Sequence, residues 1–194
     1  MSYSPGSSSG TRGLGPGGGR HERGRVPISD YLKSLRAKVG HELLLVPSVT
    51  AIVYDGQGRV LLAKHAEGGV WVAPGGSVEP NESPSDAVVR ETWEEAGLLV
   101  EPVGVVGVYG GPEFEVTYGN GDRVTYLMTV FECRPLGGRL MPDGLETLEV
   151  GYFAEAELAG LNLPAWARAV LPDAFRGRKG AHFQAVTWRP RKEA

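Results

Sequence analysis

The chain has few of the features that mark secreted, membrane or nucleic-acid-binding proteins. Its 194 residues include a single cysteine, Cys133, which excludes an intramolecular disulfide and which we expect to be a small buried side chain. It has no run of about 18 apolar residues and no apolar segment after its N-terminal charges, so we expect neither a membrane span nor a signal peptide. With 20 Lys and Arg against 23 Asp and Glu, it lacks the basic excess of a dedicated nucleic-acid binder. A cytoplasmic protein is the expectation.

The composition predicts one folded domain between two tails. Residues 1–26 hold eight glycines and no apolar periodicity, which predicts a disordered Gly/Ser-rich tail. Residues 27–176 have the composition of a globular domain, since 41% of the chain is hydrophobic and 22% is charged. Residues 177–194 are predicted to be a basic C-terminal tail. The length leaves no room for a second core of ordinary size.

Periodicity and turn residues predict an α/β fold. Ser29 and Gly40 bound a short helix, and Ser83 with Gly97 bounds a helix of about 13 residues that begins with proline. Residues 43–54 and 59–63, joined by the turn Asp55-Gly56-Gln57-Gly58, are interpreted as a hairpin. The other expected elements are strands at 71–73, stopped by Pro74-Gly75-Gly76, and at 103–109, 113–118 and 123–133, a hairpin turn at 119–122, and C-terminal helices over 158–175 broken at Pro164.

Three carboxylates share one stripe of the second helix. At 100° per residue, Glu91, Glu94 and Glu95 fall within about 100° of one another. Such neighbours repel, and a bound hard cation removes the penalty, which favours a Mg²⁺ or Mn²⁺ site. The opposite side of the helix, with Val88, Val89, Thr92, Trp93 and Ala96, is expected to pack on a sheet. The alternative is a solvated face on which Arg90 and Glu94 form an exposed pair.

The spacing around this stripe decides between the two interpretations. Gly76 is followed after five residues by Glu82, and after seven more by Arg90-Glu91-Thr92-Trp93-Glu94-Glu95-Ala96-Gly97-Leu98. Seven fixed residues at this spacing match by chance about once in 10⁸ placements. The segment resembles the Nudix box, G-x5-E-x7-R-E-U-x-E-E-x-G-U, and the chain is identified by it as similar to Nudix hydrolases.

The resemblance implies a fold and a division of roles. It implies a Nudix-type α/β/α sandwich with a mixed central sheet over residues 27–176. Glu91, Glu94 and Glu95 would hold Mg²⁺, or Mn²⁺, and the carbonyl of Gly75 would add an oxygen. Arg90 would orient Glu91, and Gly76, Glu82 and Gly97 would be structural. Thr92 and Ala73 depart from the aliphatic and larger residues that are usual at their positions, but neither replaces a metal ligand.

A loop carboxylate is the next expectation from the resemblance. Similar proteins often supply one near an aromatic pair that begins the next strand, and Tyr152-Phe153 looks like that pair. Glu146 is the choice for an extra ligand or the general base, with Glu149 in reserve. The alternative is that both carboxylates only solvate a loop.

The implied reaction is metal-dependent hydrolysis of the diphosphate linkage of a nucleoside diphosphate derivative, with Glu91 or Glu146 as the base. ADP-ribose or a nucleotide sugar is favoured, on weak support from Pro112 and Phe114 beyond the box. The alternatives are nucleoside triphosphate pyrophosphohydrolysis of the MutT type and a non-catalytic, nucleotide-sensing domain. A homodimer is compatible with the sequence. The candidates for substrate binding, each of which could equally be a core residue, are Trp71, Tyr109, Phe114, Tyr118 and Tyr126.

Overall fold

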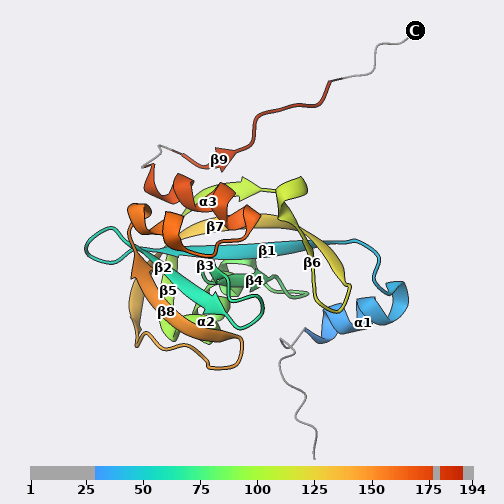
Figure 1. Cartoon of the computed structure of the whole chain (residues 1–194), viewed down its shortest axis with the longest axis horizontal. Helices are drawn as coiled ribbons and strands as arrows, with labels where there is room; N and C mark the ends of the chain where they lie inside the picture. The colour runs from blue at the N-terminus through green and yellow to red at the C-terminus, as the bar shows by residue number, and fades with distance from the viewer. Residues whose placement is uncertain (1–28, 177–179, 190–194) are drawn as a thin grey trace, which may run out of the picture.

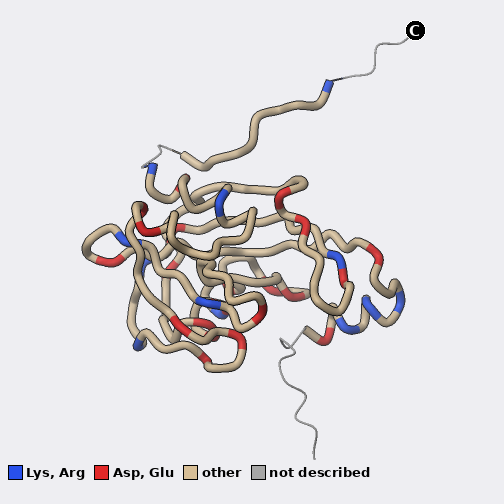
Figure 2. The backbone as a smooth tube through the Cα atoms, in the orientation of Figure 1, with Lys and Arg blue, Asp and Glu red and all other residues tan. Residues whose placement is uncertain are grey.

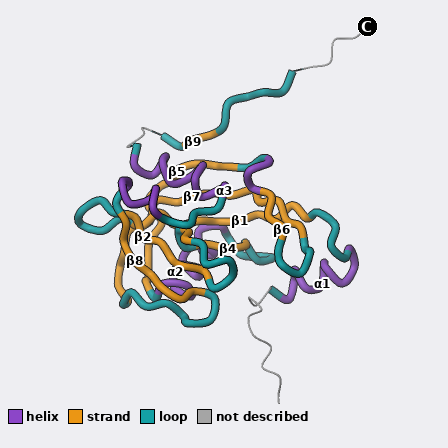
Figure 3. The backbone as a smooth tube through the Cα atoms, viewed as in Figure 1, coloured by secondary structure: helices purple, strands orange, loops and turns teal. Residues whose placement is uncertain are grey.

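The computed structural model describes residues 29–176 and 180–189. The predicted tail of residues 1–26 lies outside these ranges, as do residues 177–179 and 190–194 of the predicted basic tail. Figure 3 shows strands forming the middle of the molecule, with helices outside them.

Two sheets form the strand layers. The larger one has the strand order β4-β1-β7-β5-β9, with β6 paired to β7; β1 runs parallel to β7 whereas β5 runs antiparallel to it, so the sheet is mixed as predicted. The smaller sheet, β3-β2-β8, is antiparallel throughout. The strands are β1 (Leu44–Val53), β2 (Val60–His65), β3 (Trp71–Val72), β4 (Gly75–Ser77), β5 (Leu98–Tyr109), β6 (Glu115–Thr117), β7 (Arg123–Gly138), β8 (Thr147–Phe153) and β9 (His182–Phe183). The helices are α1 (Asp30–Val39), α2 (Pro84–Ala96) and α3 (Ala165–Phe175), with short 3-10 turns at η1 (Pro112–Phe114) and η2 (Glu155–Gly160).

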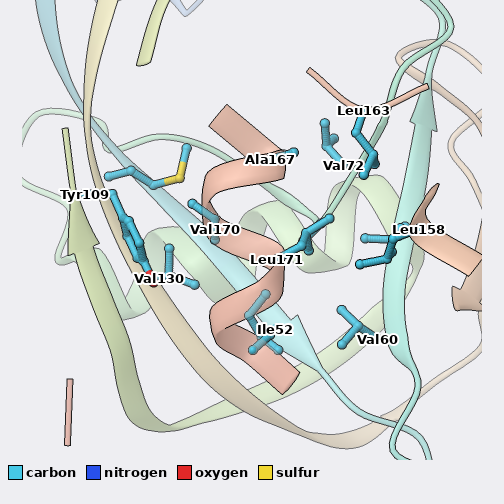
Figure 4. Close-up of a cluster of buried hydrophobic side chains, with 14 of the residues drawn as sticks. Ile52, Val60, Val72, Tyr109, Val130, Leu158, Leu163, Ala167, Val170 and Leu171 are labelled. Carbon is cyan, nitrogen blue, oxygen red and sulfur yellow. The ribbon is translucent and has the colours of Figure 1, made fainter. Parts of the chain in front are cut away.

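The two main helices cover opposite faces of the larger sheet, which confirms the α/β/α sandwich (Figure 1). Alternate side chains of a strand point to opposite faces, and β1 is buried on both of them. Ile52 lies in the core under α3, beside Val170 and Leu171 (Figure 4). Ala51 lies in the second core, with Val88 of α2. Burial of these side chains fixes the position of α2, and α2 carries the acidic stripe.

The predicted hairpin of residues 43–54 and 59–63 is wrong. The turn exists, because Asp55 Oδ1 accepts hydrogen bonds from the Gln57 and Arg59 amides. However, only the bridge between Tyr54 and Val60 joins the two strands. Beyond it, β1 pairs with β4 and β7 while β2 pairs with β3 and β8. Local turn chemistry cannot reveal this separation, because the partners that each strand takes are distant in the sequence.

Three smaller expectations also change. Trp93 does not pack on the sheet, since 53% of its surface is exposed, whereas Val88 is fully buried. The Pro74-Gly75-Gly76 stop ends β3 but also begins β4, because the chain passes there from one sheet to the other. Tyr152 and Phe153 end β8 rather than begin a strand. In the C-terminal segment, β9 adds a short parallel strand beside β5.

Helix α1 is joined to the β6–β7 turn by polar contacts. The helix begins after Ser29, whose hydroxyl accepts a hydrogen bond from the Leu32 amide, and it ends at Gly40 as predicted. The Arg36 guanidinium donates to the Arg123 carbonyl at 2.6 Å, and Asp122 lies 2.8 Å from the His41 imidazole. Residues at the N-terminal end of the described chain thereby hold the turn that carries Tyr118.

The described residues contain no candidate membrane span, and their charged residues are dispersed. None of the helices in residues 29–176 and 180–189 is long and apolar enough to cross a membrane. Figure 2 shows acidic and basic residues interspersed over the fold rather than gathered in one basic surface. Cys133 is buried as expected, and burial raises the pKa of its thiol to about 12, so that the thiolate is scarce at neutral pH.

Candidate active site

Helix α2 begins and ends at the residues that its sequence predicts. The Ser83 hydroxyl accepts a hydrogen bond from the Asp86 amide, and Pro84 occupies the first turn, where no backbone donor is needed. Gly97 ends the helix with a φ of 68°, and a Cβ there would lie 2.6 Å from the Arg139 carbonyl oxygen. The departure at Thr92 is accommodated, because its buried hydroxyl donates to the Val88 carbonyl at 2.6 Å.

A first set of contacts, here called the Arg90 cluster, surrounds the guanidinium of Arg90 and consists of Ser77, Glu82, Arg90, Glu91 and Glu94. Arg90 binds both oxygens of Glu82, at 2.8 and 2.9 Å. It also donates to Glu91 at 2.8 Å and to Glu94 at 3.1 Å, and to the Ser77 carbonyl at 3.1 Å. Glu82 in turn accepts from the Glu79 amide, which closes the loop before α2. The planar guanidinium suits this many-sided role better than an ammonium group.

Glu91 sits so close to Gly76 that any side chain at that position would displace the Glu91 carboxylate. A Cβ on Gly76 would lie 2.4 Å from Glu91 Oε1, far inside van der Waals contact. Burial, together with the nearby charge of Glu95, raises the pKa of Glu91 to about 7, although Arg90 acts in the opposite direction. Gly76 is therefore required for the close approach of strand β4 to the carboxylate of α2.

A second set, here called the Glu95 cluster, surrounds the most buried carboxylate of the stripe and consists of His65, Gly75, Glu95, Glu146 and Thr147. Glu95 is 4% exposed, and its Oε2 accepts a hydrogen bond from the Gly75 amide at 3.0 Å. Its Oε1 lies 3.4 Å from His65 Nε2. The Thr147 hydroxyl donates to the backbone carbonyl of Glu95 at 2.8 Å. Strands from both sheets thus converge on one residue of α2.

His65 is the functional candidate that the sequence did not indicate. Burial acts to lower the pKa of His65, but the adjacent Glu95 carboxylate, followed by the charges of Glu146 and Asp143, raises it overall. The ladder between β2 and β8 shifts register between Lys64 and His65, because Leu148 of β8 is left without a partner there and His65 pairs with Thr147. No local motif marks a histidine that ends a strand, and its neighbours become visible only in three dimensions.

Glu146, a member of the Glu95 cluster, lies in the loop before β8. Asp143 Oδ1 accepts hydrogen bonds from the amides of Leu145, Glu146 and Thr147, and the Ala66 amide donates to the Glu146 carbonyl at 2.8 Å. Burial and the charge of Glu95 raise the pKa of the Glu146 carboxyl. Glu149 instead pairs with Lys64 at 2.6 Å and is exposed. Of the two loop carboxylates, Glu146 is the one that the structure brings to the α2 stripe.

The carboxylates do not converge on one point as the side chains stand. Among residues 29–176 and 180–189, no three His, Cys, Asp or Glu side chains form a group that could hold a metal ion. Glu94 is turned towards Arg90, and Glu95 is turned towards the Gly75 amide and His65. The donor chemistry nevertheless fits a hard cation, because the oxygens of Glu91 and Glu95 lie close enough to raise the pKa of Glu91.

Two of the aromatic candidates are core residues, which corrects their assignment to substrate binding. Tyr109 and Phe114 are 2% and 1% exposed, and both belong to the core under α3. The Tyr109 ring stacks on His182 with 5.1 Å between centroids, and its hydroxyl donates to Asp173. Neither ring offers a face on which a nucleobase could stack.

The remaining aromatic candidates keep polar or exposed edges. Trp71 is partly exposed and packs edge-on against Phe153, with 4.8 Å between ring centroids. The hydroxyls of Tyr118 and Tyr126 are hydrogen-bonded to each other, at the end of the sheet where α1 docks. The Ser48 hydroxyl, two positions along β1 from Val46, the partner of Tyr126, is buried and has no hydrogen-bond partner. Trp71, Tyr118 and Tyr126 are each partly exposed and offer ring surface or hydroxyls to a ligand.

The chain is similar in sequence and in fold to known proteins. The family model described as the NUDIX domain matches residues 44–174. A MutT-like protein of Streptomyces ambofaciens is 38% identical over 47% of this chain, and this chain spans only 53% of that relative. A putative 8-oxo-dGTP diphosphatase of Bacillus subtilis is 30% identical over 58% of this chain and 69% of its own length. The crystal structure of an ADP-ribose pyrophosphatase from Streptococcus suis is 28% identical, with a TM-score of 0.54 over 72% of this chain and 98% of that one.

Proposed function

The chain belongs to the Nudix family, and we propose that it is a divalent-cation-dependent pyrophosphohydrolase that cleaves the diphosphate linkage of a nucleoside diphosphate derivative. The observation that carries the proposal is the Glu91 carboxylate, which Gly76 and Arg90 hold close to buried Glu95. Two carboxylates so placed repel one another, and Mg²⁺ or Mn²⁺ would remove that repulsion. Glu91, Glu94, Glu95 and the Gly75 carbonyl are the proposed ligands.

The side chains divide the chemistry among them. A cation bound there would neutralise phosphate oxygens and make water more acidic. Glu91 is the proposed general base, because a carboxyl whose pKa is raised towards neutrality can take a proton from the attacking water. Arg90 orients Glu91, and Glu82 holds Arg90. Glu146 is the alternative base, and it otherwise adds negative charge with which to bind the cation.

ADP-ribose and nucleotide sugars are the favoured substrates. The solved ADP-ribose pyrophosphatase, which this chain matches over nearly its full length, supports them. The neutral hydroxyls of Tyr118 and Tyr126 suit the sugar and base edges of such molecules. The relatives named for MutT and for 8-oxo-dGTP support a nucleoside triphosphate as the second candidate. Cytoplasmic location and a homodimer stay predictions.

Product identification tests the proposal and separates the candidates. The purified protein would be incubated with ADP-ribose, nucleotide sugars, dinucleoside polyphosphates and deoxynucleoside triphosphates, with Mg²⁺ or with EDTA. A nucleoside monophosphate and a sugar phosphate are the expected products, formed only with the cation. Release of inorganic diphosphate from a triphosphate would favour the second candidate. Binding without turnover of any substrate would indicate a nucleotide sensor, and turnover that persists in EDTA would reject the metal site.

A further inference from the structure

The buried Glu95 carboxylate needs partners that the Nudix box does not provide. At 4% exposure it has lost nearly all contact with water, and a buried carboxylate is costly unless both of its oxygens are paired. Arg90 pairs with Glu82, Glu91 and Glu94 rather than with Glu95. The Gly75 amide supplies a donor to Oε2. A donor for Oε1 has to come from elsewhere in the fold.

His65 is placed to be that donor. Its Nε2 is buried, lies 3.4 Å from Glu95 Oε1, and is one of two buried side-chain polar atoms in the described residues that lack a hydrogen bond. The backbone on either side of the imidazole is fixed, because the His65 amide donates to the Val70 carbonyl and the Ala66 amide to the Glu146 carbonyl, both at 2.8 Å.

We propose that His65 is a positioning residue, which together with the Gly75 amide anchors the Glu95 carboxylate for binding of the divalent cation. The inference rests on the proposed function, since it assumes that Glu95 is a cation ligand. Residues that hydrogen-bond a metal ligand orient it, and their loss commonly weakens metal binding by about 10–100-fold. The Glu95 oxygens are thereby fixed by β2 and β4, one strand from each sheet.

The test measures cation binding in the absence of substrate. Mn²⁺ binding would be titrated by calorimetry and by loss of the free Mn²⁺ signal in electron paramagnetic resonance. His65→Leu removes the donor while keeping an apolar body, and His65→Gln places an amide donor near the position of Nε2. We expect Mn²⁺ to bind about tenfold more weakly to His65→Leu and within about threefold of wild type to His65→Gln. Lys64→Gln, which removes the pair with Glu149 and the ammonium above the Trp71 ring but no contact of Glu95, is the matched control and should bind Mn²⁺ normally.

The outcomes separate the inference from the function on which it rests. If wild type binds no Mn²⁺ and hydrolyses nothing, the proposed function fails and the inference fails with it. If wild type binds Mn²⁺ and His65→Leu binds it equally well, only the positioning role is rejected. Equal losses in His65→Leu and His65→Gln would also reject it, because they would mean that the imidazole itself is needed.

A folding defect would not leave the inference undecided. Should His65→Leu unfold, the pair His65→Gln and His65→Asn carries the test, because asparagine is too short to reach Glu95 from β2 while keeping the same amide. A positioning role predicts that Asn weakens Mn²⁺ binding and Gln does not. Equal binding by both variants, with equal melting temperatures in EDTA, would overturn it.

Discussion

The Arg90 cluster and the Glu95 cluster lie on the same helix but are assembled in different ways. Every member of the Arg90 cluster comes from residues 77–94, at the end of β4, in the loop before α2 and on α2 itself. The Glu95 cluster joins α2 to β2, β4 and the start of β8, over residues 65–147. The first cluster is held by one charged side chain, whereas the second is held by backbone amides, a hydroxyl and an imidazole. One stripe of acidic residues is thus supported locally on one side and by the whole fold on the other.

The largest effect should come from removing a carboxylate that is proposed to bind the cation, whether it belongs to the Arg90 cluster or to the Glu95 cluster. We expect Glu94→Gln and Glu95→Gln each to lower kcat on the order of 100-fold or more, because each removes a charge proposed to bind the cation. Steady-state hydrolysis of the substrate found in the product screen measures the effect. Glu101→Gln, which breaks an exposed pair with Arg134 on β5 and β7, should leave kcat unchanged. Near-normal turnover by both α2 variants would favour a solvated helix face.

A rise in pH should expose the repulsion between the clusters when the cation is absent. The pKa of Glu91 is about 7 in the folded protein, above its ordinary value of 4.5. Between these two pH values the folded protein keeps a proton that the unfolded chain releases, so its stability falls as the pH rises. The full loss is on the order of 3 kcal/mol.

Thermal unfolding at pH 5 and pH 8, in EDTA and in Mg²⁺, measures this loss. In EDTA the melting temperature should be lower at pH 8, and Mg²⁺ should restore more of it at pH 8 than at pH 5. Glu91→Gln should flatten the dependence in EDTA, since the titrating group is gone. A pH-independent melting temperature for the wild-type protein in EDTA would show that Glu91 is not held near other negative charge.

Arg90→Lys should damage the local cluster and spare the other. Lysine keeps the charge but cannot bind both oxygens of Glu82 while reaching Glu91 and the Ser77 carbonyl. We expect about a tenfold fall in kcat and a loss of roughly 1–3 kcal/mol in the free energy of unfolding by urea. Mn²⁺ binding should change less than in His65→Leu. Arg134→Lys, in an exposed pair with Glu101, provides the control. An Arg90→Lys protein as stable and active as wild type would contradict the role given to the Arg90 guanidinium.

The local cluster could be predicted from the sequence because its geometry follows from spacing along a helix. Ser83, Pro84 and Gly97 fix where α2 begins and ends, and the rotation of 100° per residue then places Glu91, Glu94 and Glu95. The same periodicity cannot say where α2 packs, so Trp93 was assigned to the sheet although it is largely exposed. Nor can it say towards which neighbour each carboxylate turns.

The Glu95 cluster could not be predicted because strand pairing creates it. The turn at Asp55 indicates a hairpin, and only the long-range pairing of β1 with β7 shows that β1 and β2 part. The separation of β2 from β1 brings His65 to Glu95 of α2. Neither His65 nor Glu95 carries a local sequence signal of this contact. Two of the aromatic candidates for substrate binding, Tyr109 and Phe114, could not be recognised as core residues for a similar reason. The position of α3, which the sequence does not give, decides that they are buried.

Glu146→Gln is expected to have the smallest effect, and it tests whether the Glu95 cluster contributes chemistry beyond support. Its loop is tied down by Asp143 and its carboxyl has a raised pKa, so the side chain is ready to act near the cation. If Glu91 is the base, Glu146→Gln should lower kcat only several-fold, leave KM unchanged and keep the acidic limb of the pH-rate profile. Removing a general base would instead cost about 10²–10⁴-fold and abolish that limb, because the titrating group is gone. Glu149→Gln, whose side chain faces Lys64, supplies the matched comparison and should behave as wild type. Loss of the limb in Glu146→Gln alone would move the base from the local cluster to the one that the fold assembles, whereas full activity in both variants would confine the reaction to the carboxylates of α2.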